Sequence, residues 1–278
     1  MLFGAHVSIA GGLANAPLNA GALGCEVFQM FTRSPQGGYV APLDKKVVGD
    51  FRKNCEESRQ KEWYVHAPYF INFASANDRI KHGSITTIRQ ELERASLLGT
   101  KYLMAHLGSF KDLGQEAGEQ QTIDALAKML DGYTGTTQFL VEISAGAGEI
   151  IGDTFEEIAA IILHKKLKKH NIGVCYDTQH GFASGYDVRT PEAVEKTLKQ
   201  FDDAIGLDRL KLSHCNDSAT EFASHRDRHE HIGEGKIGRA GFEALLKNKN
   251  LKNVNFVLET EIGGVKKDLK TLKEIRKI

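Results

Sequence analysis

The chain has 278 residues, of which 41% are hydrophobic and 26% charged, as is usual for a globular protein. Its 36 basic and 36 acidic side chains give a formal net charge of zero, which excludes a protein that coats nucleic acid through overall positive charge. The sequence contains neither an apolar run long enough to cross a membrane nor the pattern of a secretory signal, so we expect a cytoplasmic protein.

Short apolar segments alternate about eight times with longer segments of helical periodicity. The short segments are rich in β-branched and aromatic residues and end in polar or glycine-rich turns, which is typical of strands. We predict strands at Leu2–Val7, Glu26–Phe31, Trp63–His66, Tyr102–His106, Phe139–Ile143, Gly173–Asp177, Leu210–His214 and Val254–Glu259.

The segments between these strands predict helices. Thr154 and Glu157 have the spacing of a capping box, in which each side chain accepts a hydrogen bond from the other residue's backbone N–H. Thr190 followed by Pro191 is typical of a helix start. An apolar stripe at helical spacing precedes Gly99 and consists of Ile85, Ile88, Leu92, Ala95 and Leu98. Strand-then-helix units of about 35 residues predict one (β/α)₈-barrel domain over residues 1–278 rather than an open sheet.

Ionisable side chains stand at the ends of six consecutive predicted strands. In a barrel of this kind the chemistry takes place at the C-terminal ends of the strands. Any one such residue is explained as a satisfied or capping polar group, but six converging groups would be costly unless metal ions neutralised them. The sequence therefore predicts a metal centre built from His66, His106, Glu142, Asp177, His214 and Glu259.

A second group of candidate ligands follows the seventh predicted strand. In an extended loop, residues two apart point the same way, so Asp227 and His229 can bind one ion together. His180 lies three positions beyond Asp177 and can reach a different ion from that residue. We expect the neighbouring His225 and His231 to be surface residues.

The ligand types indicate the metal. Imidazole mixed with carboxylate, without thiolate, suits Zn²⁺ and also Mn²⁺ or Fe²⁺, but not Ca²⁺. The four cysteines form no C-x-x-C pair, so we expect free thiols rather than disulfides or a zinc ribbon; they are Cys25, Cys55, Cys175 and Cys215.

Six segments together form a pattern far more specific than any single short motif, and they are 4–8, 66–69, 177–187, 214–218, 227–235 and 258–260. Through them the chain resembles, over nearly its whole length, the endonuclease IV family of AP endonucleases, which cut DNA beside abasic sites. The resemblance implies hydrolysis of the phosphodiester 5′ to an abasic nucleotide in double-stranded DNA, leaving a 3′-hydroxyl. It also implies three zinc ions, which the ligand types would allow Mn²⁺ to replace in part. We expect a monomer, as for an enzyme that scans DNA for lesions.

The family's ligand set, carried over by position, maps onto nine residues of this chain. His66 and His106 would hold the first ion and Glu142 would bridge it to the second, with Glu142 and Glu259 able to accept the proton of the attacking water. The remaining ligands are Asp177, His214 and Glu259 for the second ion and His180, Asp227 and His229 for the third.

Residues expected to contact DNA lie in the loops around the same site, and they are Arg33, Gln36, Tyr69, Phe70 and Arg228. Gln36 departs from the family, which usually has arginine there, and Gly38 lies where a tryptophan is usual. Leu107, Ile143 and Gln179 also depart from the usual residues.

Two other functions fit part of the pattern. A metal-dependent sugar isomerase or epimerase of the xylose-isomerase-like barrels also places Glu, Asp and His around a divalent metal, but it does not require His180, Asp227 and His229. A DNA-binding protein with structural zinc would close each site with four ligands. An open position in the first and third sites favours catalysis over the structural alternative.

Overall fold

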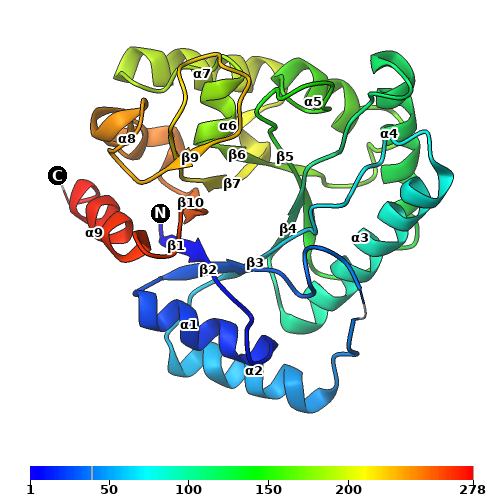
Figure 1. Ribbon diagram of the computed structural model, residues 1–278, viewed down its shortest axis with the longest axis horizontal. Coiled ribbons are helices and arrows are strands. Elements are labelled where there is room, and N and C mark those ends of the chain that lie inside the picture. The colour runs from blue at the N-terminus through cyan, green and yellow to red at the C-terminus, as the bar shows by residue number, and fades with distance from the viewer. Residues whose placement is uncertain (39, 278) are drawn as a thin grey trace.

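Eight parallel strands close into a barrel in the computed structural model, which describes residues 1–38 and 40–277 (Figure 1). Neighbouring strands follow the order of the chain, and the last strand pairs with the first, with Phe3 opposite Phe256. Each strand overlaps one of the predicted ones, so the predicted barrel is confirmed. The strands are β1 (Phe3–His6), β2 (Val27–Met30), β3 (Trp63–His66), β4 (Tyr102–Ala105), β5 (Gln138–Glu142), β6 (Gly173–Asp177), β7 (Leu210–His214) and β10 (Asn255–Leu258).

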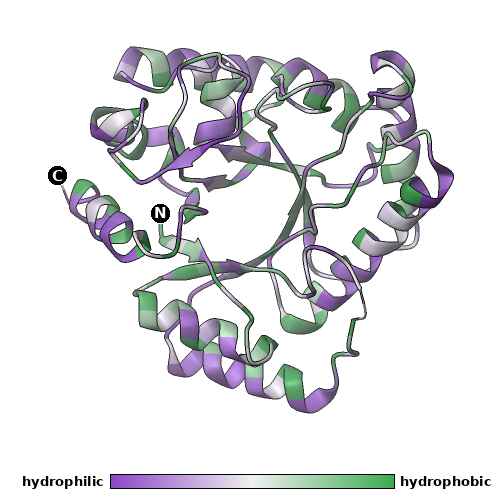
Figure 2. Ribbon diagram, in the orientation of Figure 1, coloured by the Kyte–Doolittle hydropathy of each residue, from purple (hydrophilic) through white to green (hydrophobic). Residues whose placement is uncertain are grey.

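Helices form an outer ring around the strands (Figure 1). They carry both hydrophilic and hydrophobic residues, as expected of elements that cover a core on one side only (Figure 2). The α-helices are α1 (Ala16–Leu23), α2 (Lys45–Glu57), α3 (Asp78–Leu98), α4 (Gln115–Leu130), α5 (Phe155–Ile162), α6 (Thr178–Ala183), α7 (Pro191–Ala204), α8 (Gly238–Lys247) and α9 (Val265–Ile275). Short 3₁₀ turns lie at Leu13–Asn15, Leu207–Arg209 and Lys249–Leu251, and a small antiparallel hairpin pairs β8 (Asp217–Ser218) with β9 (His229–Glu230).

The helix boundaries follow the predicted caps, with one correction. The predicted apolar stripe of α3 is buried, and Gly99 ends the helix in the left-handed region at a φ of 73°. The side chain of Thr190 caps α7 by accepting a hydrogen bond from Ala193 N. Thr154 caps α5 in the same way, but Glu157 does not reciprocate: its carboxylate accepts from Gly152 N instead. The loop before the helix thus supplies the donor that the predicted capping box assigned to Thr154 N.

Side chains fill the barrel interior in layers, and the layer further from the C-terminal ends of the strands is apolar. Seven strands each contribute one side chain to it, namely Val27, Tyr64, Met104, Leu140, Cys175, Leu212 and Val257. Residues two positions further along a strand point to the same side. The next layer, toward the C-terminal ends of the strands, therefore consists of the residues two positions after these.

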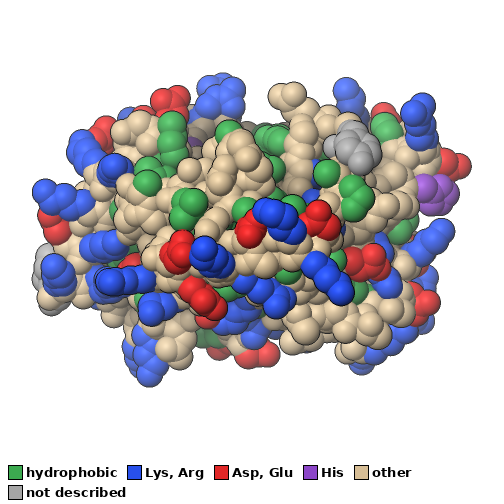
Figure 3. Space-filling model, turned by 90° about the horizontal axis from the view of Figure 1, so that it is seen from below, with side chains coloured by type: hydrophobic (Ala, Val, Ile, Leu, Met, Phe, Trp, Pro, Cys, Tyr) green, Lys and Arg blue, Asp and Glu red, His purple; other side chains and the backbone are tan. Residues whose placement is uncertain are grey.

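The four cysteines are all buried and free, as predicted. In the described part of the chain no helix is both long and apolar enough to cross a membrane. On the face shown in Figure 3, acidic side chains lie among more prominent basic ones.

Candidate metal centre

The layer above the apolar one is made almost entirely of ionisable and polar groups. Adding two to each residue of the apolar layer gives Gln29, His66, His106, Glu142, Asp177, His214 and Glu259. On β1, His6 occupies the corresponding level. Six of the predicted ligands thus converge because parallel strands in register place every second residue inside the barrel.

The first cluster contains His66, His106 and Glu142, whose side-chain N and O atoms lie within 4.8 Å of one another. Glu142 Oε2 is 3.0 Å from His66 Nε2 and 3.5 Å from His106 Nε2. His66 Nδ1 lies 2.7 Å from the carbonyl oxygen of Ala67, which can only accept, so Nδ1 carries the hydrogen and Nε2 faces the cluster.

The second cluster uses the other oxygen of Glu142. Glu142 Oε1 lies 2.8 Å from His214 Nδ1, which is also 3.2 Å from Glu259 Oε2 and 3.8 Å from Asp177 Oδ2. Glu142 therefore faces both clusters, with one oxygen toward each. Asp177 is held in place because its Oδ1 caps α6, accepting from the backbone of Gln179 and His180.

The third cluster lies where the hairpin approaches α6. Asp227 Oδ1 is 3.4 Å from His180 Nε2 and 3.5 Å from His229 Nε2. The structure adds Asp177 to this group, since its Oδ2 lies 3.8 Å from His229 Nε2. Asp177 thus borders the second and third clusters together, an arrangement that sequence spacing does not reveal.

The third cluster has the geometry of a cation site. The Nδ1 atoms of His180 and His229 both face backbone carbonyl oxygens, those of Ile143 and Glu259. Their Nε2 atoms therefore point at each other across 3.3 Å. Two imidazole nitrogens at this distance need a proton or a cation between them. Without an ion, His180 supplies a proton, and a metal ion that displaced it would be shared by both nitrogens, so these residues fit a metal ion.

Charge complementarity inside the site is strong. Burial would raise the pKa of Glu142, but the facing His106 and His214 outweigh burial and hold it well below the usual range. Burial would lower the pKa of His180, but Asp177, Asp227 and Glu142 hold it well above the usual range. The hydrogen bond from His180 lowers the pKa of Asp227 to about 2. The carboxylates of Glu142 and Asp227 are thus ionised and can accept a cation.

The donor set contains only nitrogen and oxygen. Cys175 lies one layer below the site, and burial raises the pKa of its thiol to about 11. A protonated thiol is a poor metal ligand, so imidazoles and carboxylates remain. The three clusters are therefore consistent with a multinuclear metal site.

Two supporting residues were missed by the sequence predictions. Gln29 Oε1 accepts from His214 Nε2 at 2.7 Å, and its amide nitrogen donates to Glu259 Oε1 at 2.6 Å. Asn216 donates to Asp177 Oδ2 at 2.7 Å and accepts from the backbone of Glu259 at 2.8 Å. Gln29 interrupts an otherwise apolar strand, and this was the one available signal. Such contacts orient ligands and fix the tautomer of His214.

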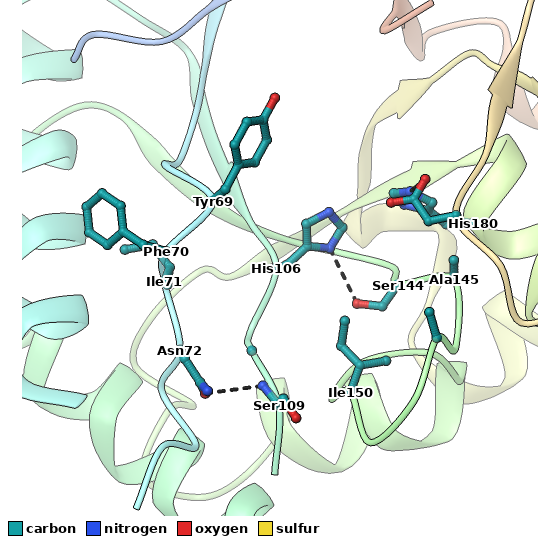
Figure 4. A pocket seen from close by; sticks show the side chains of 13 residues that line it. Tyr69, Phe70, Ile71, Asn72, His106, Ser109, Ser144, Ala145, Ile150 and His180 are labelled. Atoms are coloured by element: carbon teal, nitrogen blue, oxygen red, sulfur yellow. Dashed lines mark hydrogen bonds and ion pairs between the residues drawn. The ribbon is translucent and has the colours of Figure 1, made fainter. Parts of the chain in front are cut away.

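Aromatic side chains line the opening of the site. A cavity of about 480 Å³ lies above the clusters, and an adjoining one of about 360 Å³ extends along the loop after β3. Tyr69 is 72% exposed and Phe70 41%, and their rings point in different directions from the same loop (Figure 4). His106 lies between the two cavities, with its Nδ1 3.3 Å from Ser144 Oγ (Figure 4).

The structure brings together two of the loops expected to contact DNA. Tyr69 N donates to Pro35 O, so the loop that carries the exposed Gln36 lies beside Tyr69 and Phe70. Arg228 is also exposed, next to Asp227.

Arg33 and His231 are engaged elsewhere. The Arg33 side chain is 8% exposed and pairs with the buried Glu91 at 2.7 Å, so a phosphate contact would require this ion pair to open. His225 is exposed, as expected of a surface residue. His231 is only partly exposed and hydrogen-bonds to the buried Asp268 at 2.7 Å.

A closed parallel barrel with three groups of histidines and carboxylates at the C-terminal ends of its strands defines a TIM-barrel metalloenzyme. The xylose isomerase-like TIM barrel family matches residues 18–276. The probable endonuclease 4 of Methanoculleus marisnigri is 37% identical over 279 residues, covering 100% of this chain and 99% of the relative. The crystal structure of endonuclease IV from Thermus thermophilus is 34% identical, with a TM-score of 0.86 over 100% of this chain and 98% of that one.

The chain belongs to the endonuclease IV family, the metal-dependent AP endonucleases. The sugar-isomerase alternative is not supported. A D-tagatose 3-epimerase-like protein shares the fold with a TM-score of 0.74, over 100% of this chain and 97% of that one, but is only 19% identical. The non-catalytic alternative is likewise excluded by membership of an enzyme family.

Proposed function

We propose that this chain acts as a monomeric, single-domain enzyme that hydrolyses the phosphodiester 5′ to an abasic nucleotide in duplex DNA with three zinc ions. His66 and His106 would hold the first ion, and Asp177, His214 and Glu259 the second. Glu142 would bridge them, which is supported by its two oxygens each facing one cluster. His180, Asp227 and His229 would hold the third, with Mn²⁺ able to replace zinc in part.

Divalent ions at these positions would supply Lewis-acid stabilisation of phosphate charge and make water a stronger acid. The chain's own groups would move the proton. Glu259 lies at the edge of the site with its side chain 16% exposed, whereas Glu142 is fully buried. Glu259 is therefore the better placed to take a proton from the attacking water and pass it to solvent, while Glu142 holds the two clusters together.

The loops at the opening would hold the DNA. Tyr69 and Phe70 offer exposed rings for the gap left by the missing base. Gln36 and Arg228 are exposed in loops that carry or adjoin residues of the opening and would contact the DNA backbone, and Arg33 would do so only after leaving Glu91. An abasic nucleotide lacks stacking and pairing, so turning it out of the duplex costs less than turning out a normal one.

The facing Nε2 atoms of His180 and His229 are the observation that carries the third ion. The test is nicking of a duplex with one abasic site, with metal content measured on the same sample. We expect cleavage on the 5′ side, a 3′-hydroxyl product and about three metal ions per chain. An intact duplex at full metal occupancy would contradict the proposal.

The number of ions has its own test. Asp227→Ala combined with His229→Ala should lower the bound metal by about one equivalent and leave the pair around Glu142 partly occupied. An unchanged metal content would show that the third cluster holds no ion.

A further inference from the structure

The loop that carries Asp227 and His229 is long and has little regular structure of its own. It spans residues 215–237, between β7 and α8, and within the described residues its regular structure is the hairpin of β8 and β9. The side chain of Asp227 is more than half exposed and lines the cavity above the clusters. Loops of this length inside a compact fold need internal support to hold a fixed shape.

The buried carboxylate of Asp217 provides that support. Its side chain is fully buried, and its two oxygens accept hydrogen bonds from five backbone N–H groups. Oδ1 receives Ser218 N at 2.8 Å and Ile237 N at 2.9 Å. Oδ2 receives Gly233 N at 2.9 Å and Gly235 N at 3.1 Å, and Gly238 N lies within 3.3 Å of both oxygens.

The glycine spacing of the segment 233–238 follows from this arrangement. Gly233 and Gly238 have φ values of 84° and 70°, which side chains rarely adopt. A Cβ on Gly235 would lie 2.4 Å from the carbonyl oxygen of Ser218 and 2.5 Å from Asp217 Oδ1. The backbone thus curls around the carboxylate, which explains a part of the sequence motif that supplies no candidate ligand.

The same residue is tied to the candidate ligands through the hairpin. Asp217 pairs with Glu230, and Ser218 with His229, so the strand that carries the carboxylate is hydrogen-bonded to the strand that carries the imidazole. The next residue, Ala219, donates from its backbone to Arg228 O at 3.0 Å. Asp217 therefore holds the C-terminal end of the loop, residues 233–237, directly through its carboxylate, and its own strand holds residues 229–230 through the hairpin.

We propose that Asp217 is a positioning residue that holds Asp227 and His229 in the metal-binding arrangement before any ion arrives. The assignment rests on the proposed third ion, which these residues and His180 would share. A ligand set that is ordered in advance loses less conformational freedom on binding, so it binds more tightly.

Amide hydrogen exchange on the intact protein tests preorganisation without any variant. The N–H groups of Gly233, Gly235, Ile237 and Gly238 should exchange at least about 100-fold more slowly than unprotected amides. This protection should persist after the metal is removed with a chelator. Free exchange of these four amides in the chelated protein would overturn the proposal, because the ion would then be ordering the loop.

Metal counting on variants tests the link to the third ion. Asp217→Asn should weaken binding of one of three zinc ions about 10–100-fold while retaining the other two. Gly235→Ala crowds the same carboxylate from the other side and should give the same selective loss. The matched control is Glu157→Gln, which makes the same carboxylate-to-amide change at a buried residue bonded to a different loop, and should leave the count unchanged.

The outcomes separate this proposal from the proposed function. If the unaltered protein binds fewer than three ions, the three-ion function is wrong, and the exchange result still decides whether Asp217 orders the loop. If the unaltered protein binds three ions and both folded variants also bind three with unchanged affinity, the positioning role of Asp217 is wrong.

Discussion

The Glu142 carboxylate lies within 3.5 Å of four imidazoles, those of His66, His106, His180 and His214. A fully buried group in so many contacts cannot move without disturbing all three clusters, because His180 belongs to the third. The charge matters as much as the shape, because an amide of the same size bridges two cations poorly.

Glu142→Gln should therefore retain the fold and lower nicking of abasic duplex at least about 100-fold. Circular dichroism would check the fold, and initial rates in saturating zinc would check the activity. Turnover near that of the unaltered protein, with metal bound, would remove Glu142 from the centre of the mechanism.

Single residues also show where prediction from sequence succeeds and where it stops. His66 and His214 could be predicted as ligands because a polar residue at a strand end has a known position in a barrel. The role of Gln29 could not, because it depends on a contact across the barrel interior with His214, 185 positions further along the chain. Asp177 likewise borders a second cluster only because the hairpin folds back over α6.

At the scale of elements, the described stretches 32–38 and 40–43 between β2 and α2 are attached to α3. Arg94, on α3, donates to the carbonyl oxygens of Thr32 and Ala41, and Glu91 binds Arg33 and the hydroxyl of Thr32. This attachment supports the tip of the segment, the turn of residues 34–37, in which Gly37 N donates to Ser34 O and a Cβ on Gly37 would lie 3.5 Å from the Phe70 ring. Gln36 is exposed in this turn, which makes a change at its side chain interpretable.

Gln36→Arg adds a cation at that tip and should tighten binding to abasic duplex, more so at low salt. One added phosphate contact steepens the dependence of log affinity on log salt by about 0.9. Dissociation constants at two salt concentrations would measure the change. Gln120→Arg, which adds the same charge on the outer helix α4, is the control. Equal affinities for Gln36→Arg and the unaltered protein at both salts would show that the tip does not approach DNA.

The start of α5 carries a pH dependence of its own. Burial raises the pKa of Glu157 to about 7, although Gly152 N donates to it. A carboxyl whose pKa is higher in the folded state stabilises the fold below its unfolded pKa, and this stability is lost as the pH rises toward about 7.

Glu157→Gln should flatten this part of the pH profile, so that the free energy of unfolding falls less between about pH 5 and about pH 8 than it does in the unaltered protein. Chemical denaturation at both pH values would measure it. The exposed neighbour provides the control Glu156→Gln. Parallel profiles for Glu157→Gln and the unaltered protein would contradict the shifted pKa.

At the scale of the whole molecule, the barrel has a continuous apolar core that does not include the metal centre. The predicted helices could be recognised by their apolar stripes and caps and the strands by their short apolar runs, whereas the 215–237 loop has no such pattern and its shape depends on Asp217. Different residues therefore stabilise the barrel and shape the metal centre.

Chelation should therefore lower Tm without unfolding the barrel. One ion held at about 100 times its dissociation constant contributes about 2.7 kcal/mol, which corresponds to at least about 5 °C for a chain of this size. Thermal melts with and without chelator, and after zinc is restored, would measure the shift. Loss of helical circular dichroism on chelation at room temperature would show that the metal is needed for folding itself.

The pairing of β1 with β10 joins the first strand of the chain to the last. Arg276 strengthens the same junction by binding Glu26 and the carbonyl oxygen of Met1. During synthesis at about 5–20 residues per second, β1 would wait roughly 10–50 s for its second partner. Throughout that interval one of its edges is open to strands of other nascent chains. During synthesis the protein is therefore open to pairing with other chains at the β10-facing edge of β1. A chain that stops before residue 255 lacks β10, so this edge stays unpaired.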